Sequence, residues 1–323
     1  MTADVLDDPR MAGASGSARA LTRGFPARPD LAEDLPLRFY IGAPHADWIS
    51  FAKVPIFISY NTLRRAFGMR RTPKAPVAVD SGGFTQLTRH GRWTISAQRY
   101  AEDLVRISRV MRLGAAHFDF AAQQDWMCEP EIIKGGRLPS GENAIGSGLS
   151  VLEHQQRTVA NLLELRALLG PYGLAEKVIP VLQGYAVDDY LAHIEQFAAA
   201  GVDLRSERLV GVGSVCRRQN TDEIRCLFRD LHRTGVRRLH GFGVSTSGLA
   251  QLAPFLTSAD SMAWSLAARR QRQPIARDCH HRTCVTCPTY ASAWRLAVID
   301  RLRRPTSKRA SAGRGHALLP AST

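Results

Sequence analysis

The sequence predicts an α/β protein built as a (β/α)₈ TIM barrel. Eight short apolar segments alternate with helical segments over residues 37–264, and each apolar segment ends in glycine or polar residues. Strands that alternate with helices are typical of parallel sheets, and polar strand ends are typical of the catalytic face of a barrel. A doubly wound sheet shares this alternation and is the alternative. With 323 residues, the chain is long enough for one domain of barrel size.

The predicted strands are runs of β-branched and other apolar residues, which suit a parallel sheet buried on both faces. In chain order they span residues 37–42, 54–59, 77–80, 116–121, 177–182, 208–213, 238–244 and 258–264. The third is the most informative, because Asp80 and two glycines follow where the apolar run stops. Glycine has no Cβ, so the backbone there can turn sharply and approach a ligand. Alternatively, Asp80 and Ser81 only cap the next helix.

The predicted helices follow the strands. Apolar residues recur at helical spacing over residues 94–113, 150–169, 187–200 and 221–234, and a glycine follows each stretch. Ser150 and Glu153 have the spacing of a capping box, and Asn220 or Thr221 is expected to cap the last of these helices. A shorter helix is expected around residues 249–255. Residues 133–148 are glycine-rich and aperiodic, and we expect a long loop over the strand ends.

The composition is that of a basic globular protein. Hydrophobic residues make up 45% of the chain, the net charge is +14, and no apolar run approaches the ~18–20 residues that span a bilayer. The N-terminal region lacks the continuous apolar segment of a secretory signal, so we expect a cytoplasmic protein. Basic pairs such as Arg64-Arg65 and Arg217-Arg218 favour a nucleic-acid partner, although a well-solvated arginine-rich surface would have the same composition.

The expected domain organisation is a barrel domain over residues 36–303, between a disordered leader at 1–35 and a disordered basic tail at 304–323. We hypothesise that the basic stretch Arg301–Arg314 adds non-specific affinity for a nucleic-acid backbone. A solvated tail without a binding role is an equal alternative.

Polar residues at the predicted strand ends form the first candidate site. In a barrel these ends meet at one face, and they carry Asp80, Asp125, Gln183, Gly211, Gly213, Gly241, Gly243 and Asp260. Neighbouring carboxylates raise one another's pKa and need a metal, a cationic substrate or hydrogen-bond donors as partners. A planar base with N–H groups would suit two carboxylates and an amide, a third carboxylate could act as nucleophile, and Phe84 could stack on the base. Asp119 would share this face only if the chain bulges before Asp125.

The second candidate site is the cysteine-rich segment at residues 279–287. Its pattern C-x-H-x₂-C-x₂-C places four ligands at the spacing of a tetrahedral Zn²⁺ site: Cys279, His281, Cys284 and Cys287. Such a set leaves no open coordination position, so the zinc would be structural. His280 could replace His281, and unrelated buried cysteines are the alternative. We interpret Cys128, Cys216 and Cys226 as small apolar residues, and His240 as the remaining histidine most worth examining.

The motif Asp80-Ser-Gly-Gly-Phe84 resembles the signature of the tRNA-guanine transglycosylases. Gln183-Gly184, Val210–Gly213, His240–Gly243 and the cysteine-rich segment follow in that family's order, so the resemblance covers roughly residues 37–300. It implies a zinc-containing TIM barrel that exchanges guanine for a 7-deazaguanine through a covalent enzyme–nucleotide intermediate. It also implies Asp260 as nucleophile, Asp80 as general acid or base, and a base-binding set made of Ser81, Gly82, Gly83, Phe84, Asp125, Gln183, Gly184, Gly211, Gly213 and Ser214.

The chain departs from the pattern of the tRNA enzymes in ways that favour DNA. Those enzymes place a glutamate against an aminomethyl group where this chain has Ser214, which favours a neutral substituent such as the nitrile of 7-cyano-7-deazaguanine. The family's nucleophile lies a few residues deeper, near Ala263 here. Together with Phe39–Gly42 and Gln124–Glu129, these features are similar to the branch that places deazapurines in DNA. Partner proteins of a DNA-modification system would fit that reading.

Three alternatives stay open from the sequence. The chain could be a tRNA-guanine transglycosylase, although no dedicated tRNA-binding element is visible in it. It could be a catalytically inactive barrel that binds nucleic acid. It could also be a metal-dependent barrel hydrolase whose carboxylates bind the metal, although no His-x-His pair follows the first strand.

Overall fold

The structure is a computed structural model that describes residues 37–68, 71–110, 117–139, 141–216, 218, 221–271, 279 and 281–303. The expectations for the leader and the basic tail concern residues outside these ranges, apart from Arg301–Arg303. The described strands are β1 (Arg38–Ala43), β2 (Ile56–Ser59), β3 (Val77–Asp80), β4 (Phe118–Ala122), β7 (Val178–Ile179), β8 (Val181–Leu182), β9 (Val210–Val212), β10 (Leu239–Gly241) and β11 (Leu256–Ser261).

Nine strands of the described chain form one parallel sheet in the order β7-β4-β3-β2-β1-β11-β10-β9-β8. β7 and β8 are the two halves of the predicted fifth strand, which is interrupted at Pro180 because proline has no N–H to donate. β7 pairs with β4 and β8 pairs with β9, and the Pro180 carbonyl accepts the Gly211 N–H at 2.8 Å. The sheet is therefore nearly closed, and the predicted barrel is confirmed.

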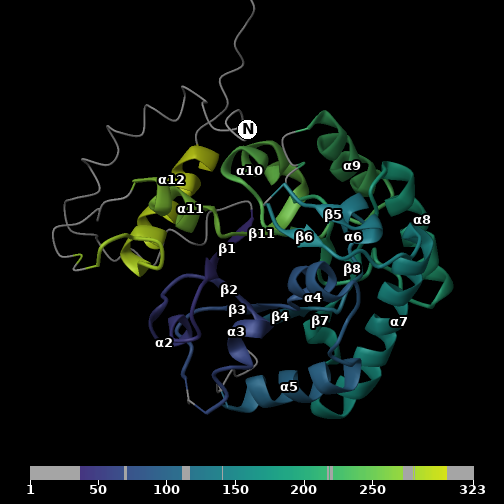
Figure 1. The fold of residues 1–323 in the computed structure, drawn as a ribbon, viewed down its shortest axis with the longest axis horizontal. Coiled ribbons are helices and arrows are strands. Elements are labelled where there is room, and N and C mark those ends of the chain that lie inside the picture. Colours follow the sequence, from purple (N-terminus) through teal and green to yellow (C-terminus); the bar gives the residue numbers. More distant parts are fainter. Residues whose placement is uncertain are drawn as a thin grey trace, which may run out of the picture.

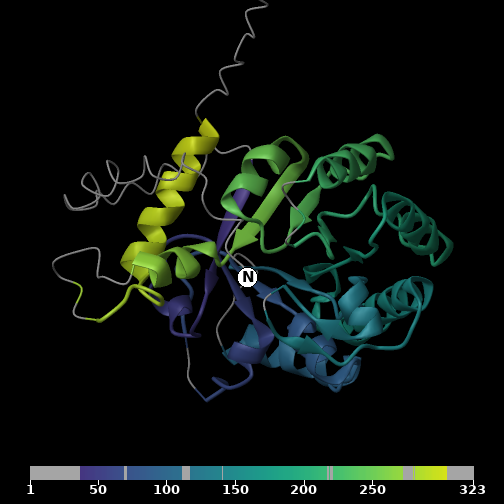
Figure 2. The ribbon, with the colours of Figure 1, turned by 45° about the horizontal axis from the view of Figure 1, so that its top comes forward.

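Helices surround this sheet (Figures 1 and 2). They are α2 (Trp48–Phe51), α3 (Tyr60–Leu63), α4 (Gly83–His90), α5 (Ala97–Val110), α6 (Pro130–Lys134), α7 (Val151–Leu169), α8 (Val187–Ala199), α9 (Asp222–Arg233), α10 (Thr246–Leu252), α11 (Ala263–Gln271) and α12 (Pro288–Arg303). Successive helices on the outside of the barrel contact one another: α5 with α7, α7 with α8, α8 with α9, α9 with α10, and α10 with α12. None of the helices in the described ranges combines the length and apolar character that a membrane crossing requires.

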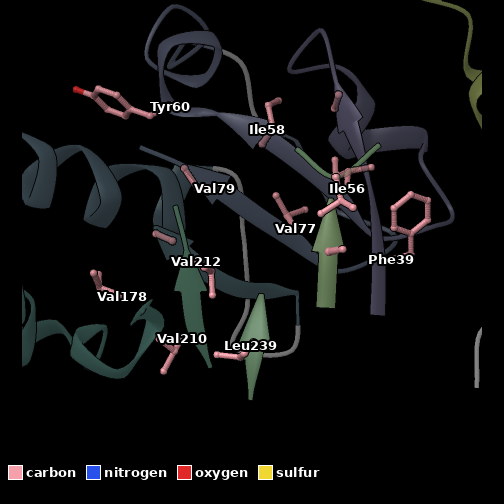
Figure 3. Packing of buried hydrophobic residues seen from close by; sticks show 14 of the residues in the cluster. Phe39, Ile56, Ile58, Tyr60, Val77, Val79, Val178, Val210, Val212 and Leu239 are labelled. Carbon is pink, nitrogen blue, oxygen red and sulfur yellow. The ribbon is translucent and has the colours of Figure 1, made fainter. Parts of the chain in front are cut away.

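The alternation of side chains along the strands divides the core into two layers. Outward-facing residues such as Ile56, Val77 and Val210 pack in the main apolar cluster together with residues of the surrounding helices (Figure 3). Inward-facing residues fill the barrel as a separate cluster: Tyr40, Phe57, Ala78, Phe120, Ile179 and Leu209, with Phe242 packed against it. The interior is therefore a packed core, and a ligand can enter only at its ends.

Local signals in the sequence predict the starts of α7 and α9 correctly. Ser150 and Glu153 form the predicted capping box of α7, and the Thr221 hydroxyl accepts the Ile224 N–H at the start of α9. Asn220, the alternative cap, lies outside the described residues. The range predicted for the eighth strand lies too late in the chain, because this strand begins at Leu256 and Ala263 already opens α11.

The segment at residues 133–148, expected as a long loop, instead contains secondary structure. It contains the end of α6 and an antiparallel pair of two-residue strands, β5 (Gly136–Arg137) and β6 (Asn143–Ala144). Leu138 and Ala144 are buried in a small apolar cluster with Leu87, Trp126 and Ile132. This burial is the reason why a glycine-rich segment without periodicity adopts a defined structure.

Candidate active site

The carboxyl ends of the strands surround a cavity of about 640 Å³. β2 pairs with β3 so that Ser59 lies beside Asp80, and β1 pairs with β11 so that Tyr40 lies beside Asp260. This register directs alternate side chains of several strands to the same opening. Most of the predicted site residues line the cavity: Asp80, Ser81, Gly83, Phe84, Asp125, Gln183, Gly213, Ser214 and Asp260.

Three predicted glycines lie outside the cavity lining. Gly82 has a φ of 81° and precedes α4, a conformation that glycine adopts without strain. A Cβ on Gly184 would lie 2.7 Å from the Cβ of Asp189, so this glycine permits close packing of α8. Gly211 lies in the middle of β9, where a Cβ would lie 2.5 Å from the Phe242 ring. These glycines shape the backbone around the site.

Asp80 is held at the end of β3 by its neighbours. Its Oδ2 accepts the Gly82 N–H at 3.1 Å. Burial in the cavity and, second to it, the negative charge of Asp260 raise the pKa of this carboxyl to about 6, against the opposing hydrogen bonds from Gly82 and Ser59. Near neutral pH, Asp80 can therefore both donate and accept a proton.

Asp125 follows β4 and meets the end of β8 through a side-chain pair. The Gln183 amide nitrogen donates to Asp125 Oδ2, and the Ser81 hydroxyl lies 3.4 Å from Oδ1. Burial raises the pKa of Asp125 to about 7, although the bond from Gln183 opposes this shift. The backbone N–H of Gln183 in turn donates to buried His193 Nδ1 at 2.9 Å, which fixes the strand end.

Ser214 joins three segments at the wall of the cavity. It has a φ of 54°, a left-handed conformation that is unusual for a residue other than glycine. Its hydroxyl oxygen accepts the Cys128 N–H at 2.8 Å and lies 2.6 Å from Gln183 Oε1 and 2.7 Å from Glu129 Oε2. One hydroxyl proton serves only one of these two oxygens at a time, so a donor on a ligand could satisfy the other.

Asp260 presents the third carboxylate from the end of β11. Its side chain is 9% exposed, and its Oδ1 accepts the Gly243 N–H at 2.9 Å. His240 Nε2 lies 3.3 Å from the same oxygen. Among the described residues of this segment, Asp260 supplies the acidic side chain of the cavity, whereas Ala263 lies beyond it at the start of α11.

The predicted zinc ligands come together next to α12. One ligand atom from each of Cys279, His281, Cys284 and Cys287 lies within 4.8 Å of all the others. The Cys279 and Cys287 sulfurs are 3.9 Å apart, and His281 Nε2 is 3.2 Å from Cys284 Sγ. Ligands around tetrahedral Zn²⁺ lie about 3.5–3.8 Å apart, so the donor set fits this ion. His280 lies outside the described residues.

A family model described as DpdA, DeoxyPurine in DNA protein A, matches residues 35–319, which is most of the chain. The chain belongs to the DpdA family. This is a DNA-guanine transglycosylase family within the tRNA-guanine transglycosylase superfamily, so the resemblance seen in the sequence is confirmed. A search of curated proteins found no match. Membership implies a transglycosylase enzyme and suggests DNA as its substrate.

In this DpdA chain, sequence reasoning misses several residues of the cavity wall. In the sequence, Glu129 is noted only as the last residue of the segment Gln124–Glu129 that resembles the family. It contacts Ser214, 85 residues later in the chain, because the barrel brings the two segments together. Phe242 and Met262 belong to predicted strands, and they share the two-residue parity of His240 and Asp260, which was the available signal. Gly243, which the sequence places at a strand end, also lines the cavity. Ser59 likewise ends a strand two positions beyond inward-facing Phe57, so the two-residue period could have identified it.

Proposed function

We propose that this chain replaces guanine in DNA with a 7-deazaguanine base, through a covalent ester between Asp260 and the deoxyribose. Family membership supports the reaction class. The observation that carries the site assignment is the set of three aspartates, Asp80, Asp125 and Asp260, which line the cavity together with Glu129 while its described lining residues include no lysine or arginine. Buried carboxylates that have no cationic side chain nearby can be stabilised by a ligand with N–H donors, and guanine is such a ligand.

Asp125 is the proposed acceptor for the N–H groups of the base. The ionised carboxylate accepts hydrogen bonds only, and the N1–H and 2-amino groups of guanine are donors on one edge. Gln183 Nε2 orients the carboxylate from the other side, and Phe84 offers an aromatic face to the ring. Because the bound base would stabilise the ionised form, base affinity should increase as the pH rises towards the pKa of about 7.

Asp260 and Asp80 share the two chemical steps. In the first, an Asp260 carboxylate oxygen attacks C1′, the C1′–N9 bond breaks, and Asp80 donates its proton to the departing guanine. In the second, Asp80 takes the N9 proton of the incoming base as that nitrogen bonds to C1′ and the ester C1′–O bond breaks. Protons and charge balance over the two steps, and the Asp260 carboxylate is restored.

The charge of Asp260 changes the pKa of Asp80 in the direction that these two steps require. The charge of Asp260 raises the pKa of Asp80, so a larger fraction of Asp80 carries a proton while Asp260 is ionised. Formation of the ester removes that charge, which makes Asp80 a stronger acid as the base departs. Return of the charge in the second step makes Asp80 a stronger base when the incoming N9–H must be deprotonated.

The incoming base is proposed to be 7-cyano-7-deazaguanine, because Ser214 offers a hydroxyl where the tRNA enzymes have a glutamate. Glu129 lies on the other side of Ser214, and its carboxylate could pair with a cationic aminomethyl group. The base with an aminomethyl substituent is therefore the alternative substrate to compare. If the nitrile base is the substrate, Glu129→Gln should leave its exchange within about threefold of the unsubstituted chain. If the aminomethyl base is the substrate, loss of the carboxylate should weaken its binding about tenfold or more.

The experiment that tests the function is a base-exchange assay on duplex DNA and tRNA in parallel, with labelled guanine and with 7-cyano-7-deazaguanine. Label should enter DNA and form a denaturant-stable protein–DNA adduct, and Asp260→Ala should abolish both. Asp203→Ala is the matched control, because Asp203 is exposed and precedes β9 at the opposite end of the barrel. Label in tRNA would favour the tRNA enzyme, and no label in either would favour an inactive nucleic-acid-binding barrel.

We further propose that the cysteine-rich cluster holds one structural Zn²⁺ through Cys279, His281, Cys284 and Cys287. All four positions are protein ligands, so the ion would only fix the segment between α11 and α12. Ser265 on α11 already donates to the Val285 carbonyl at 2.7 Å. Metal analysis should find about one zinc per chain in the purified protein and almost none in Cys284→Ser. A full zinc content in that variant would contradict the assignment.

A further inference from the structure

His240 lies inside the barrel directly below the proposed nucleophile. Its side chain is fully buried. Aromatic rings of three strands and of the following turn surround the imidazole, with ring centroids 4.7–6.1 Å away: Tyr40, Phe57, Phe120 and Phe242. These rings leave the imidazole no path to water, so its two nitrogens depend on protein partners.

The two nitrogens of His240 have unequal partners. Nδ1 lies 2.8 Å from the hydroxyl of buried Ser258. Nε2 makes no good hydrogen bond with any described residue, and Asp260 Oδ1 lies 3.3 Å from it. An ionised carboxylate can only accept, so a contact with Asp260 requires the proton on Nε2. Nδ1 is then the acceptor of the Ser258 hydroxyl proton.

We propose that His240 is a positioning residue for Asp260 and that Asp260 Oδ2 is the oxygen that attacks C1′. This inference rests on the proposed function. Oδ1 accepts the Gly243 N–H at 2.9 Å and lies 3.3 Å from His240 Nε2, within reach of its proton, whereas no described residue donates to Oδ2. The two donors fix the carboxylate plane and keep Oδ1 as the carbonyl oxygen of the ester. Ser258 sets the tautomer that allows this contact.

The variants His240→Leu, His240→Gln and Ser258→Ala test this role. Leucine fills the apolar space without a donor, and we expect kcat to fall about 10- to 100-fold because a slightly misplaced nucleophile reacts slowly. The KM for DNA should change less than about twofold. Glutamine can present an N–H near the position of Nε2, so it should restore part of kcat. Ser258→Ala should lower kcat less than leucine does at position 240.

A second measurement does not depend on activity. Nitrogen NMR of the histidine rings in the intact protein should show His240 as the Nε2–H tautomer, and Asp260→Ala should change its signals. An Nδ1–H tautomer, or a wild-type kcat in His240→Leu, would overturn the role of His240. A wild-type protein that exchanges no base would instead count against the proposed function. A His240→Leu variant that fails to fold leaves the tautomer and the Ser258→Ala variant as tests.

A second cavity, of about 570 Å³, carries a separate inference. It is lined by Tyr60, Arg64, Arg65, Phe67, Gly68, Arg99, Asp103 and Arg106. Asp103 already accepts the Tyr60 hydroxyl at 2.7 Å and pairs with Arg99 at 3.1 Å. Arg64, Arg65 and Arg106 form no ion pair with a carboxylate of the described chain. The cavity therefore has an excess of positive charge that suits an anion.

Helix α3 separates this arginine cavity from the active-site cavity. Thr62 lines the active-site cavity, while Tyr60 and Arg64 line the arginine cavity. Residues two apart on a helix point to nearly opposite sides, so the cavities lie roughly one helix diameter apart, about 10 Å. We infer that the arginine cavity binds a backbone phosphate of the DNA strand that flanks the target nucleotide.

Salt-dependent binding to duplex DNA tests this inference without base exchange. Arg64→Ala with Arg65→Ala should weaken binding and reduce the slope of log K against log salt by about one unit for each phosphate that the variant no longer neutralises. Arg225→Ala on α9 is the control, because that arginine pairs with exposed Asp222. Inorganic phosphate should compete only weakly if the DNA backbone is the ligand. An unchanged slope in the double variant would overturn the inference.

Discussion

Two groups of carboxylates occupy opposite ends of the same barrel, and they differ in their charge partners. At the end where the strands begin, Asp119 receives the Tyr40 hydroxyl and pairs with Arg38 and, at 2.9 Å, with Arg208. Burial opposes ionisation of Asp119, but the bond from Tyr40 and the two arginines hold its pKa below the ordinary value. This carboxylate therefore stabilises the fold in its ionised form.

At the other end, Asp80 and Asp125 have no cationic partner among the described residues, and burial raises their pKa to about 6 and about 7. A buried carboxylate that lacks a cation costs stability, and such groups cluster at functional sites. Charge pairing, more than burial, therefore separates the structural carboxylate from the reactive ones. Substitutions at the two ends should have opposite effects on stability and activity.

The largest expected effect is the loss of exchange in Asp80→Asn. Asparagine keeps the shape of the side chain but can neither donate nor accept the proton of the base, so kcat should fall roughly 10²- to 10⁴-fold. The melting temperature should stay equal or rise, because a buried charge next to Asp260 is removed. Base-exchange kinetics and thermal unfolding measure both quantities, with Asp203→Asn as control. A large loss of stability would place Asp80 in the structural group.

The next effect is a loss of stability in Asp119→Ala. The substitution leaves Tyr40, Arg38 and Arg208 without their shared acceptor, which should cost about 2–4 kcal/mol of unfolding free energy. The exchange rate per folded molecule should remain within about threefold. Asp203→Ala is the matched control, because its pair with Arg205 at 3.8 Å is more than half exposed and should contribute under ~0.5 kcal/mol. Equal losses in the two variants would contradict the distinction between the two ends.

The sequence predicts the barrel well because apolar runs that end in polar residues are a local signal. The same reasoning places Asp80 and Gln183 at one face, since each ends an apolar run. Asp260 joins them although the range predicted for its strand lies too late in the chain. The zinc ligands can be predicted equally well from the sequence. All four donors lie within nine residues, so their grouping is visible without knowledge of the tertiary structure.

The positions of Asp119, Glu129 and His240 relative to the site could not be predicted from the sequence, because they depend on strand register and on closure of the barrel. Asp119 and Asp125 are six residues apart, and the pairing of β3 with β4 shifts between Phe118 and Phe120. The chain thus bulges at Asp119, which lies with the arginines at the far end. Glu129 reaches Ser214, and His240 reaches Asp260, only across strands that are distant in the sequence. Contacts between such distant strands produce no periodic pattern in the sequence, so they cannot be predicted from it.

The smallest expected effect is a difference in the pH dependence of stability between Asp125→Asn and the unsubstituted chain. The folded-state pKa of Asp125 is about 7, above the ordinary 3.8. The carboxyl therefore favours folding below pH 3.8, and this contribution is lost as the pH rises towards 7. The variant should gain roughly 1–3 kcal/mol relative to the unsubstituted chain between about pH 4 and 7, with no further change above.

Asp119 should act in the opposite direction and in another pH window. Its folded-state pKa is lowered, so its contribution is present above pH 3.8 and is lost as the pH falls through that lower value. Denaturant unfolding at a series of pH values should therefore separate the two ends of the barrel, with Asp125→Asn diverging from the unsubstituted chain only above about pH 4. Parallel curves from about pH 4 to 8 would mean that Asp125 is ionised in the folded protein, and its pairing with Gln183 would then suffice to hold the charge.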